Sequence, residues 1–248
     1  MAEAARLLDT IDLGFTEADV VALNREHAGR ATLDVMRALL STIAPGRTAV
    51  VSSFGTESAV LLDIVARVDP ATPVIFLDTL KLFPETLDYR DALVERLGLR
   101  DVRTIRPEPA TLTARDATGM RWSYDPDGCC ELRKVIPLAG ALAAFSASIS
   151  GRKSFQASTR AALQLFEADD GRIKVNPLAG WTKADIDAWF TANHLPRHPL
   201  EAKGYPSIGC MPCTTTVRPG EDPRAGRWRG WDKTECGIHG DVSELPSF

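Results

Sequence analysis

The sequence has few cysteines and histidines, no long apolar run and almost no net charge. Its 248 residues include five cysteines and four histidines, and the formal net charge is −4. Such a balance argues against a nucleic-acid binder or a protein held on a membrane surface. No apolar run approaches the roughly 18–20 residues of a membrane span. Residues 1–20 also lack the basic, apolar and small-residue order of a signal peptide. We therefore expect a soluble, cytoplasmic protein.

The five cysteines fall into a pattern that a reducing compartment makes informative, because cytoplasmic thiols rarely form structural disulfides. Two are adjacent, two form a CxxC pair and one is left over: Cys129 and Cys130, Cys210 and Cys213, and Cys236. Two pairs can supply four thiolates to one metal centre, which leaves a single reactive thiol. Adjacent cysteines favour an iron–sulfur cluster over zinc, whose ligands are typically two to four residues apart. A structural zinc site remains the alternative.

Strand and helix patterns alternate along the chain, which predicts an α/β fold with a parallel sheet flanked by helices. Thr16 is the expected N-cap of the first helix, and Pro137 is expected to interrupt a later one. The predicted strands are 47–53, 73–78, 102–107, 146–151 and 173–178. The predicted helices are two within 17–43, then 57–68, 84–97, 131–145 and 182–193.

The same pattern suggests three parts of a single domain. Residues 1–44 form N-terminal helices, and residues 45–200 form a nucleotide-binding α/β unit. Residues 201–248 lose the periodicity and are rich in Pro, Gly, Arg and Trp. We expect this last part to contain a cluster-ligand loop and an extended, mobile catalytic arm.

A candidate phosphate loop, SSFGTES (52–58), lies between the first strand and its helix. Such a turn exposes backbone N–H groups at the positive end of a helix dipole. It does not read GxxxxGK[ST], which disfavours a Walker-type nucleotide triphosphatase. An ordinary strand-to-helix turn is the alternative. The loop residues that we assign to substrate binding are Ser53, Phe54, Gly55, Thr56 and Ser58.

Two further polar residues follow the second strand. Asp78 and Thr79 open the segment LDTLKLFPET (77–86). Ligands of open α/β sheets bind beyond the carboxyl ends of the strands. We therefore expect both side chains beside the phosphate loop, in contact with a ribose or base.

The leftover thiol lies in KTECGIH (233–239), among several arginines. Cations lower a thiol pKa and raise the thiolate fraction, and arginines bind phosphate or sulfate oxygens in pairs. Cys236 is therefore the candidate nucleophile, and His239 a candidate acid or base. A stray cysteine in a tail is the alternative.

Taken together, these residues resemble the assimilatory adenylyl-sulfate reductases of the phosphoadenylyl-sulfate/adenylyl-sulfate reductase family. The resemblance covers about residues 45–240 and implies an adenine nucleotide α-hydrolase-like (PP-loop) fold. It also implies a 4Fe-4S cluster on Cys129, Cys130, Cys210 and Cys213. The motifs that carry it are SFGTES (53–58), CCELRK (129–134), NPLAGWT (176–182), GYPSIGCMPC (204–213), AGRW (225–228) and ECGIH (235–239).

The resemblance implies a reaction and further site residues. Adenylyl sulfate would be reduced to sulfite and AMP through an S-sulfocysteine on Cys236, in assimilatory sulfate reduction. Lys134 would join the catalytic residues, between cluster and substrate. The additional substrate-binding residues that it implies are Arg133, Gly151, Arg160, Arg224 and Arg227.

Partners and alternatives follow from the same comparison. Because no reductant domain follows ECGIH in this sequence, we expect a separate thioredoxin or glutaredoxin, and neither nucleic acid nor membrane. The alternatives are a phosphoadenylyl-sulfate or dual-specificity reductase and, in another class, a zinc-stabilised PP-loop binding or tRNA-modifying protein. The sequence leaves open whether the protein is a homo-oligomer. Leu80 and the segment 153–157 depart from the family pattern, which affects the nucleotide pocket.

Overall fold

The computed structural model describes residues 14–156, 160 and 162–238. In this part of the chain six strands form one sheet in the order β3-β2-β1-β4-β6-β5. Neighbouring strands are parallel except β5 and β6, so the predicted α/β fold with a central parallel sheet is confirmed. The strands are β1 (Thr48–Val51), β2 (Val74–Leu77), β3 (Val102–Ile105), β4 (Ala147–Ser150), β5 (Phe166–Asp169) and β6 (Arg172–Val175).

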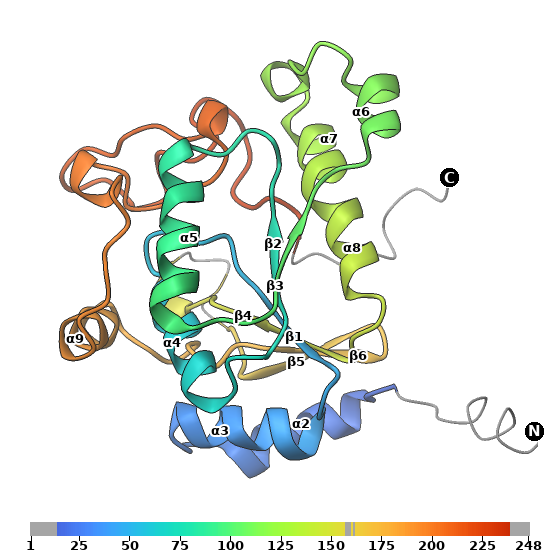
Figure 1. The fold of residues 1–248 in the computed structure, drawn as a ribbon, viewed down its shortest axis with the longest axis vertical. Helices are drawn as coiled ribbons and strands as arrows, with labels where there is room; N and C mark the ends of the chain where they lie inside the picture. Colours follow the sequence, from blue (N-terminus) through green and yellow to red (C-terminus); the bar gives the residue numbers. More distant parts are fainter. Residues whose placement is uncertain (1–13, 157–159, 161, 239–248) are drawn as a thin grey trace, which may run out of the picture.

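Helices cover both faces of the sheet. They include α4 (Ser58–Val68), α5 (Pro84–Leu97) and α8 (Ile136–Leu142). Val50 and Phe76 belong to the larger apolar core together with residues of α4 and α5, whereas Ala49 and Ile75 pack with residues of α8. Figure 1 shows α5 and α8 on opposite sides of the strands. Because strand side chains alternate, continuous apolar runs suit strands that are buried on both faces.

Local capping signals set several of the helix ends. Thr16 and Thr182 each form a capping box with the Asp three residues later. Gly98 ends α5 in the left-handed conformation at φ 64°, which glycine adopts without a Cβ penalty. These ends agree with the predictions. The helices that complete the N-terminal part and the larger core are α2 (Glu17–His27), α3 (Thr32–Ala38), the π-helix η1 (Leu39–Ile43) and α9 (Lys183–Ala192).

The cysteine-bearing helix differs from its prediction. The helix begins at Pro126 rather than near residue 131, as α7 (Pro126–Cys130). Asp125 caps it by accepting from the Gly128 N–H. A π-helical turn, η3 (Glu131–Val135), joins α7 to α8, and Pro137 lies in the first turn of α8. Pro137 therefore does not end the helical segment, but the α-helical pattern is interrupted by the π-helical turn directly before it.

Several elements have no counterpart in the sequence prediction. Strand β5 pairs antiparallel with β6 across a turn at Asp170 and Gly171, where both φ values are positive. The helix α6 (Pro109–Arg115) follows β3. The short 3₁₀ segments are η2 (Arg121–Ser123), η4 (Ser154–Gln156), η6 (Glu201–Lys203) and η7 (Met211–Cys213).

The C-terminal segment, residues 201–238, lies against the loops that follow β1 and β2. The Thr56 hydroxyl donates to the Pro206 carbonyl at 2.9 Å. The Met211 N–H donates to the Lys81 carbonyl at 2.7 Å, beside a bridge between Leu82 and Cys210. The CxxC loop is thereby fixed at the carboxyl end of the sheet. No helix among the described residues is long and apolar enough to cross a membrane.

His198 is a buried ionisable group outside the sheet, with only 1 % of its surface exposed. Its Nδ1 accepts from the Leu200 N–H at 3.2 Å, so Nε2 carries the proton and donates to the Thr86 hydroxyl at 3.1 Å. Burial lowers the pKa of His198 to about 4, although the charge of Glu85 opposes that shift. The ring is therefore neutral in the folded protein at pH 7.

This neutral histidine predicts a loss of stability in acid. The unfolded chain binds a proton at His198 below about pH 6.5, whereas the folded protein does so only near pH 4. Stability is therefore fully present above pH 6.5 and falls between pH 6.5 and 4, by about 2 kcal/mol at pH 5. A His198→Asn variant, whose amide oxygen still accepts from Leu200, should lose that part of the pH dependence. Urea unfolding of both proteins at pH 7 and pH 5 measures it, and equal pH slopes would contradict the assignment.

Candidate active site

The order in which the chain adds strands to the sheet reverses between the neighbouring strands β1 and β4. From β1 the chain continues to β2 on one side, whereas β4 has β6 on its other side. Ligands of open α/β sheets bind at such points, beyond the carboxyl ends of the strands. A cavity of about 420 Å³ lies there, lined by the loop 52–58, by residues that follow β4 and by the C-terminal segment. Its volume lies within the range of small-molecule sites, roughly 300–1,000 Å³.

The charges around this cavity favour an anionic ligand. Basic side chains outnumber carboxylates among the lining residues. Cations gathered in a concave, poorly solvated site raise the local concentration of anions. The basic residues are Lys134, Arg152, Lys153, Arg160, Lys183, Arg224 and Arg227, and the acidic ones are Glu57, Glu201 and Glu235.

The loop after β1 offers free backbone donors. The N–H groups of Gly55, Thr56 and Glu57 have no acceptor among the described residues. Successive unpaired N–H groups before a helix form an anion site. A Cβ added at Gly55 would lie 3.4 Å from the Ser53 hydroxyl and 3.9 Å from the Ile208 carbonyl and the Ser58 hydroxyl, all ordinary contact distances. The protein itself therefore leaves room for a side chain here, so any need for glycine comes from a ligand.

A Gly55→Ala variant should accordingly fold normally but bind a nucleotide weakly. We expect an unchanged unfolding midpoint and an affinity for AMP reduced by about tenfold or more, because the methyl group would obstruct the phosphate. Calorimetric titration with AMP and thermal unfolding measure the two effects. Gly226→Ala is the matched control, since its Cβ would overlap the Thr215 carbonyl oxygen. That variant should lose stability, and normal AMP binding by Gly55→Ala would contradict the assignment.

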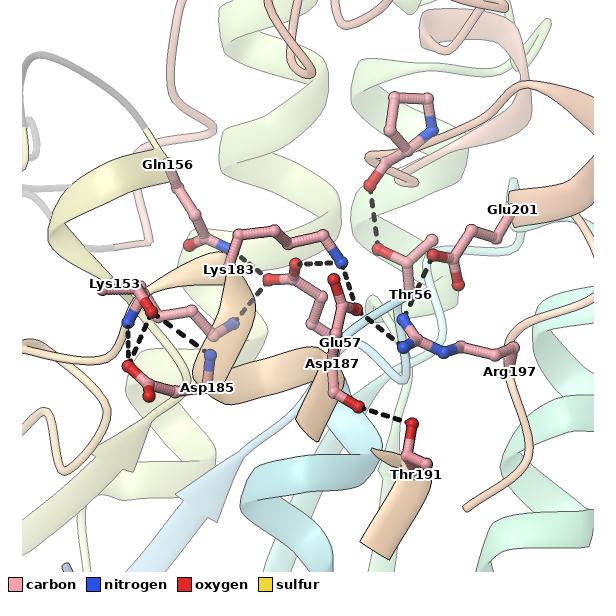
Figure 2. Close-up of polar contacts among 12 residues, drawn as sticks. Thr56, Glu57, Lys153, Gln156, Lys183, Asp185, Asp187, Thr191, Arg197 and Glu201 are labelled. Carbon is pink, nitrogen blue, oxygen red and sulfur yellow. Dashed lines mark hydrogen bonds and ion pairs between the residues drawn. The ribbon is translucent and has the colours of Figure 1, made fainter. Parts of the chain in front are cut away.

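Glu57 holds the phosphate loop to the segment after β4. Its carboxylate accepts from the Lys153 ammonium and the Gln156 amide, each at 2.9 Å, and lies 3.5 Å from the Lys183 ammonium. Figure 2 shows Glu57 between these three side chains. Lys153 is 2 % exposed, and burial lowers its pKa although Glu57 opposes the shift. The departure at 153–157 thus supplies partners to the phosphate loop; Ala157 lies outside the described residues.

A chain of ion pairs continues from this contact to the far side of the cavity. Lys183 binds Asp187 at 2.8 Å, Asp187 binds Arg197 at 2.6 Å, and Arg197 reaches Glu201 at 3.3 Å. The chain is visible in Figure 2. Because α9 carries Lys183 and Asp187, it ties the phosphate loop to the start of the C-terminal segment.

Two arginines of the cavity meet the carboxylate of Glu235. Arg160 Nη2 lies 2.7 Å from Oε1 of Glu235, and Arg224 Nη2 lies 3.1 Å from Oε2. Arg160 also donates to the Gln156 amide oxygen at 2.8 Å. The two guanidinium groups are therefore drawn together although they lie far apart in the sequence.

Cys236 follows Glu235 in the sequence and lines the same cavity, as Lys134 does. Beyond it, Gly237 has φ 84° and Ile238 packs against the apolar cluster under α8. The left-handed turn at Gly237 allows the chain to place an apolar side chain in the core directly after the thiol. The described part of the chain ends at this point, and His239 lies outside it.

The other four cysteines line a second, smaller cavity: Cys129, Cys130, Cys210 and Cys213. Burial raises the pKa of Cys129 and Cys213, and raises that of Cys130 to about 11 although Lys134 opposes the shift. No group of three or more His, Cys, Asp or Glu side chains in the described chain is arranged to hold a metal ion. What the four thiols share is therefore the wall of one cavity.

Lys134 connects the two cavities, because it lines both. Burial acts to lower its pKa, but the charges of Cys210, Cys236 and Cys130 outweigh burial and raise the pKa above its ordinary value. No carboxylate within the described chain forms an ion pair with it. The groups that favour the charge of this buried ammonium are therefore cysteine side chains rather than carboxylates.

Most of the predicted site residues meet around the larger cavity. The ones that line it are Ser53, Gly55, Thr56, Ser58, Thr79, Lys134, Gly151, Arg160, Arg224, Arg227 and Cys236. The remaining described residues lie elsewhere. Phe54 is fully buried and packs edge-on against Phe76. Asp78 binds Arg106 at 2.9 Å. Arg133 binds Asp116 at 2.6 Å and lines the smaller cavity.

Leu80, which departs from the family pattern, lies outside the larger cavity. Its φ is 59°, and its N–H donates to the Asp78 carboxylate at 3.0 Å. The left-handed conformation costs a non-glycine residue about 1–2 kcal/mol. The backbone therefore keeps the turn that glycine would favour, and the leucine side chain is 52 % exposed.

Comparison with known proteins agrees with this geometry. The family described as the phosphoadenosine phosphosulfate reductase domain matches residues 47–216. A Mesorhizobium japonicum protein named adenosine 5'-phosphosulfate reductase is 56% identical over 77% of this chain and 75% of its own length. The protein of the same name from Mycolicibacterium smegmatis is 44% identical over 74% of this chain and 78% of its own length.

Solved structures share the fold. A phosphoadenylyl-sulfate reductase from Candida auris, in a phosphate complex, superposes with a TM-score of 0.67 at 24% identity, covering 82% of this chain and 98% of the other. The Candida glabrata FMN adenylyltransferase with FMN and an ATP analogue gives a TM-score of 0.52 at 15% identity, covering 86% and 74%. These likenesses show that the α/β fold is shared. Because the family match covers most of the chain and the relatives are 44–56% identical, this chain belongs to the phosphoadenosine phosphosulfate reductase family.

Proposed function

We propose that this chain reduces adenylyl sulfate to sulfite and AMP in the cytoplasm, as part of assimilatory sulfate reduction. The relatives named adenosine 5'-phosphosulfate reductase support that substrate. The observation that carries the proposal is one cavity that brings together a thiol, a buried ammonium and an anion loop: Cys236, Lys134 and residues 53–58.

The cavity suits the two ends of a sulfonucleotide. The unpaired N–H groups of the loop 55–57 would bind the phosphate, and Arg160, Arg224 and Arg227 would bind the sulfate oxygens. Guanidinium groups bind such oxygens in pairs and so fix their orientation. The ribose and adenine would lie toward the carboxyl end of β4, near Gly151 and Phe155, which line the cavity.

In the first step the Cys236 thiolate would attack the sulfur of the bound substrate. A bond forms between Sγ and the sulfate sulfur, and the bond from that sulfur to the phosphate oxygen breaks. AMP leaves with the bonding electron pair, and the enzyme retains an S-sulfocysteine. The buried ammonium of Lys134 lines the same cavity and forms no ion pair with a carboxylate of the described chain, so it would stabilise the negative charge that gathers at the reacting sulfur atoms.

In the second step a thioredoxin or glutaredoxin thiolate would attack Sγ of Cys236 and release sulfite. The second thiol of the reductant then displaces Cys236, so the dithiol supplies both electrons and leaves as a disulfide. The segment that carries Cys236 must open for this exchange. Its irregular, Gly- and Pro-containing sequence is suited to such a movement.

We also propose that the four remaining cysteines hold a 4Fe-4S cluster, as the resemblance implies. A cubane takes one thiolate at each iron, whereas the ligands of a single zinc ion all lie about 2.3 Å from it. The four thiols that line one cavity would each bind one iron of the cubane. The Nε donors of Arg133 and Arg227, buried and unpaired in the described chain, line the same cavity and suit a sulfide-rich group. The cluster would supply charge beside Lys134, which helps to orient the sulfate.

The substrate is tested by comparing sulfite release from adenylyl sulfate and from phosphoadenylyl sulfate, with thioredoxin supplied. We expect adenylyl sulfate to be preferred by at least about tenfold in kcat/KM. A preference for the phosphorylated substrate would identify the alternative reductase, and no sulfite from either would exclude both reductases.

The cofactor is tested by metal analysis. Protein purified without oxygen should be brown and contain about four iron and four labile sulfide per chain. Colourless protein with one zinc per chain would instead support a zinc-stabilised binding or tRNA-modifying protein.

A further inference from the structure

The acidic residue next to the nucleophile occupies the two arginines that the substrate is expected to need. Glu235 accepts from Arg160 Nε at 3.0 Å and lies 2.7 Å from its Nη2, while its other oxygen lies 3.1 Å from Arg224. Arg224 also donates to the Thr234 carbonyl at 2.8 Å. All three charged side chains line the cavity, and the arginines are 11 % and 18 % exposed. A carboxylate of the chain itself therefore lies in the position of an anionic ligand.

Two guanidinium groups in a narrow cavity repel each other and are costly to leave without counter-charge. Burial lowers the pKa of Arg224, because a charged guanidinium is costly to remove from water. The charge of Glu235 opposes this shift. The carboxylate removes this cost while no ligand is bound. A sulfate or phosphate group offers the arginines the same kind of oxygen acceptor, with greater charge, and so competes for them.

We propose that Glu235 is an internal counter-anion that holds residues 234–238, here called the Cys236 segment, at the cavity. The anionic end of the substrate would displace Glu235 from Arg160 and Arg224. This inference rests on the proposed function, because it takes those arginines as ligands of the phosphosulfate. Glu235 acts here as a positioning residue, since it touches the arginines and not the reacting atoms. Substrate binding would thereby be coupled to the loss of the ion pairs between Glu235 and the two arginines, which are one of the attachments of the Cys236 segment.

The segment keeps a second attachment on the other side of the thiol. Ile238 packs against the apolar cluster under α8, which includes Leu138, Leu142 and Phe145. Cys236 therefore lies between an ionic and an apolar attachment, with the left-handed turn at Gly237 between the thiol and the latter. Displacing Glu235 frees only the ionic side, so the thiol can move toward the substrate sulfur without the segment leaving the cavity.

The first test uses binding, with Cys236→Ser as background so that no turnover occurs. Glu235→Gln removes the competing charge but preserves the shape of the side chain. We expect adenylyl sulfate to bind about tenfold tighter to the double variant than to Cys236→Ser alone, because a neutral amide competes weakly for guanidinium groups. Adenosine, which has no anionic group, should bind both proteins equally. Unchanged or weaker binding of adenylyl sulfate would overturn the proposal, since Glu235 would then orient the arginines rather than compete.

The second test follows the segment itself in enzyme that is purified without oxygen and free of nucleotide. Iodoacetamide should alkylate Cys236 about fivefold faster in Glu235→Gln than in the wild type, as measured by peptide mass spectrometry. Glu221→Gln is the matched control. Glu221 pairs with Arg229 at 3.0 Å within the C-terminal segment, residues 201–238, but does not line the cavity. Its alkylation rate should equal that of the wild type. Equal rates in all three proteins would also overturn the proposal, whereas failure of the proposed function would appear separately, as wild-type enzyme that releases no sulfite.

Discussion

Cys236→Ser enzyme should release sulfite from adenylyl sulfate at least about 10⁴-fold more slowly than the wild type, which is in effect a complete loss. A serine hydroxyl is almost fully protonated at neutral pH and is a far weaker nucleophile toward sulfur than a thiolate. The other cysteines are not placed to replace it. Cys129, Cys130 and Cys213 line only the second cavity, and Cys210, which lines both cavities, is buried. Sulfite release with excess thioredoxin measures the effect.

The same variant should retain its ligand site and cluster. Its affinity for AMP and its iron content should equal those of the wild type, since Cys236 belongs to neither the anion loop nor the four-cysteine cavity. A single-turnover experiment with ³⁵S-labelled substrate adds a direct criterion, because label should remain on wild-type protein when thioredoxin is omitted and be absent from the variant. Turnover within about a hundredfold of the wild type would show that another group attacks sulfur.

The parts of the fold that depend on local signals could be predicted from the sequence. Apolar, β-branched runs gave the central strands, and the capping threonines Thr16 and Thr182 gave helix starts that the structure confirms. The position of the anion loop followed from the order of strand, loop and helix. The hairpin of β5 and β6 was missed, although its Asp170-Gly171 turn is a strong hairpin signal.

The pairing of charges across the site could not be predicted, because it joins residues that are distant in the sequence. Arg160 and Glu235 lie 75 positions apart, and Lys153 and Glu57 lie 96 apart. Sequence patterns assigned the arginines to a substrate without revealing that a carboxylate of the chain already binds them. Asp78 is a similar case: its strand-end position predicted a ligand contact, whereas Arg106, which follows β3, is its partner.

Lys134 is one of the residues that line both cavities. The π-helical turn Glu131–Val135 places it directly after the adjacent cysteines. In the described chain its ammonium has no carboxylate partner, and only 9 % of the residue is exposed. Burying an unpaired charge normally costs several kcal/mol, so such a residue lowers stability unless anions are bound beside it.

Lys134→Met should therefore separate stability from activity. We expect kcat/KM for adenylyl sulfate to fall about 10³-fold, roughly 4 kcal/mol of transition-state stabilisation, because a buried cation beside developing charge is lost. The free energy of unfolding should stay equal or rise by about 1 kcal/mol, because methionine fills the same volume without the cost of burying a charge. Sulfite assays and urea unfolding measure the two quantities.

The two measurements together identify the role of the residue. Lys203→Met is the matched control, since Lys203 is a surface lysine that pairs with Glu85 at 3.1 Å and lies outside both cavities. It should change neither quantity measurably, because exposed ion pairs contribute little. If Lys134→Met lost stability in proportion to its activity, the ammonium would be a structural element of the four-cysteine cavity. A large loss of activity at unchanged stability would mean that the charge serves the reaction, and that the wild-type fold tolerates its burial because substrate and thiolates supply the missing anions.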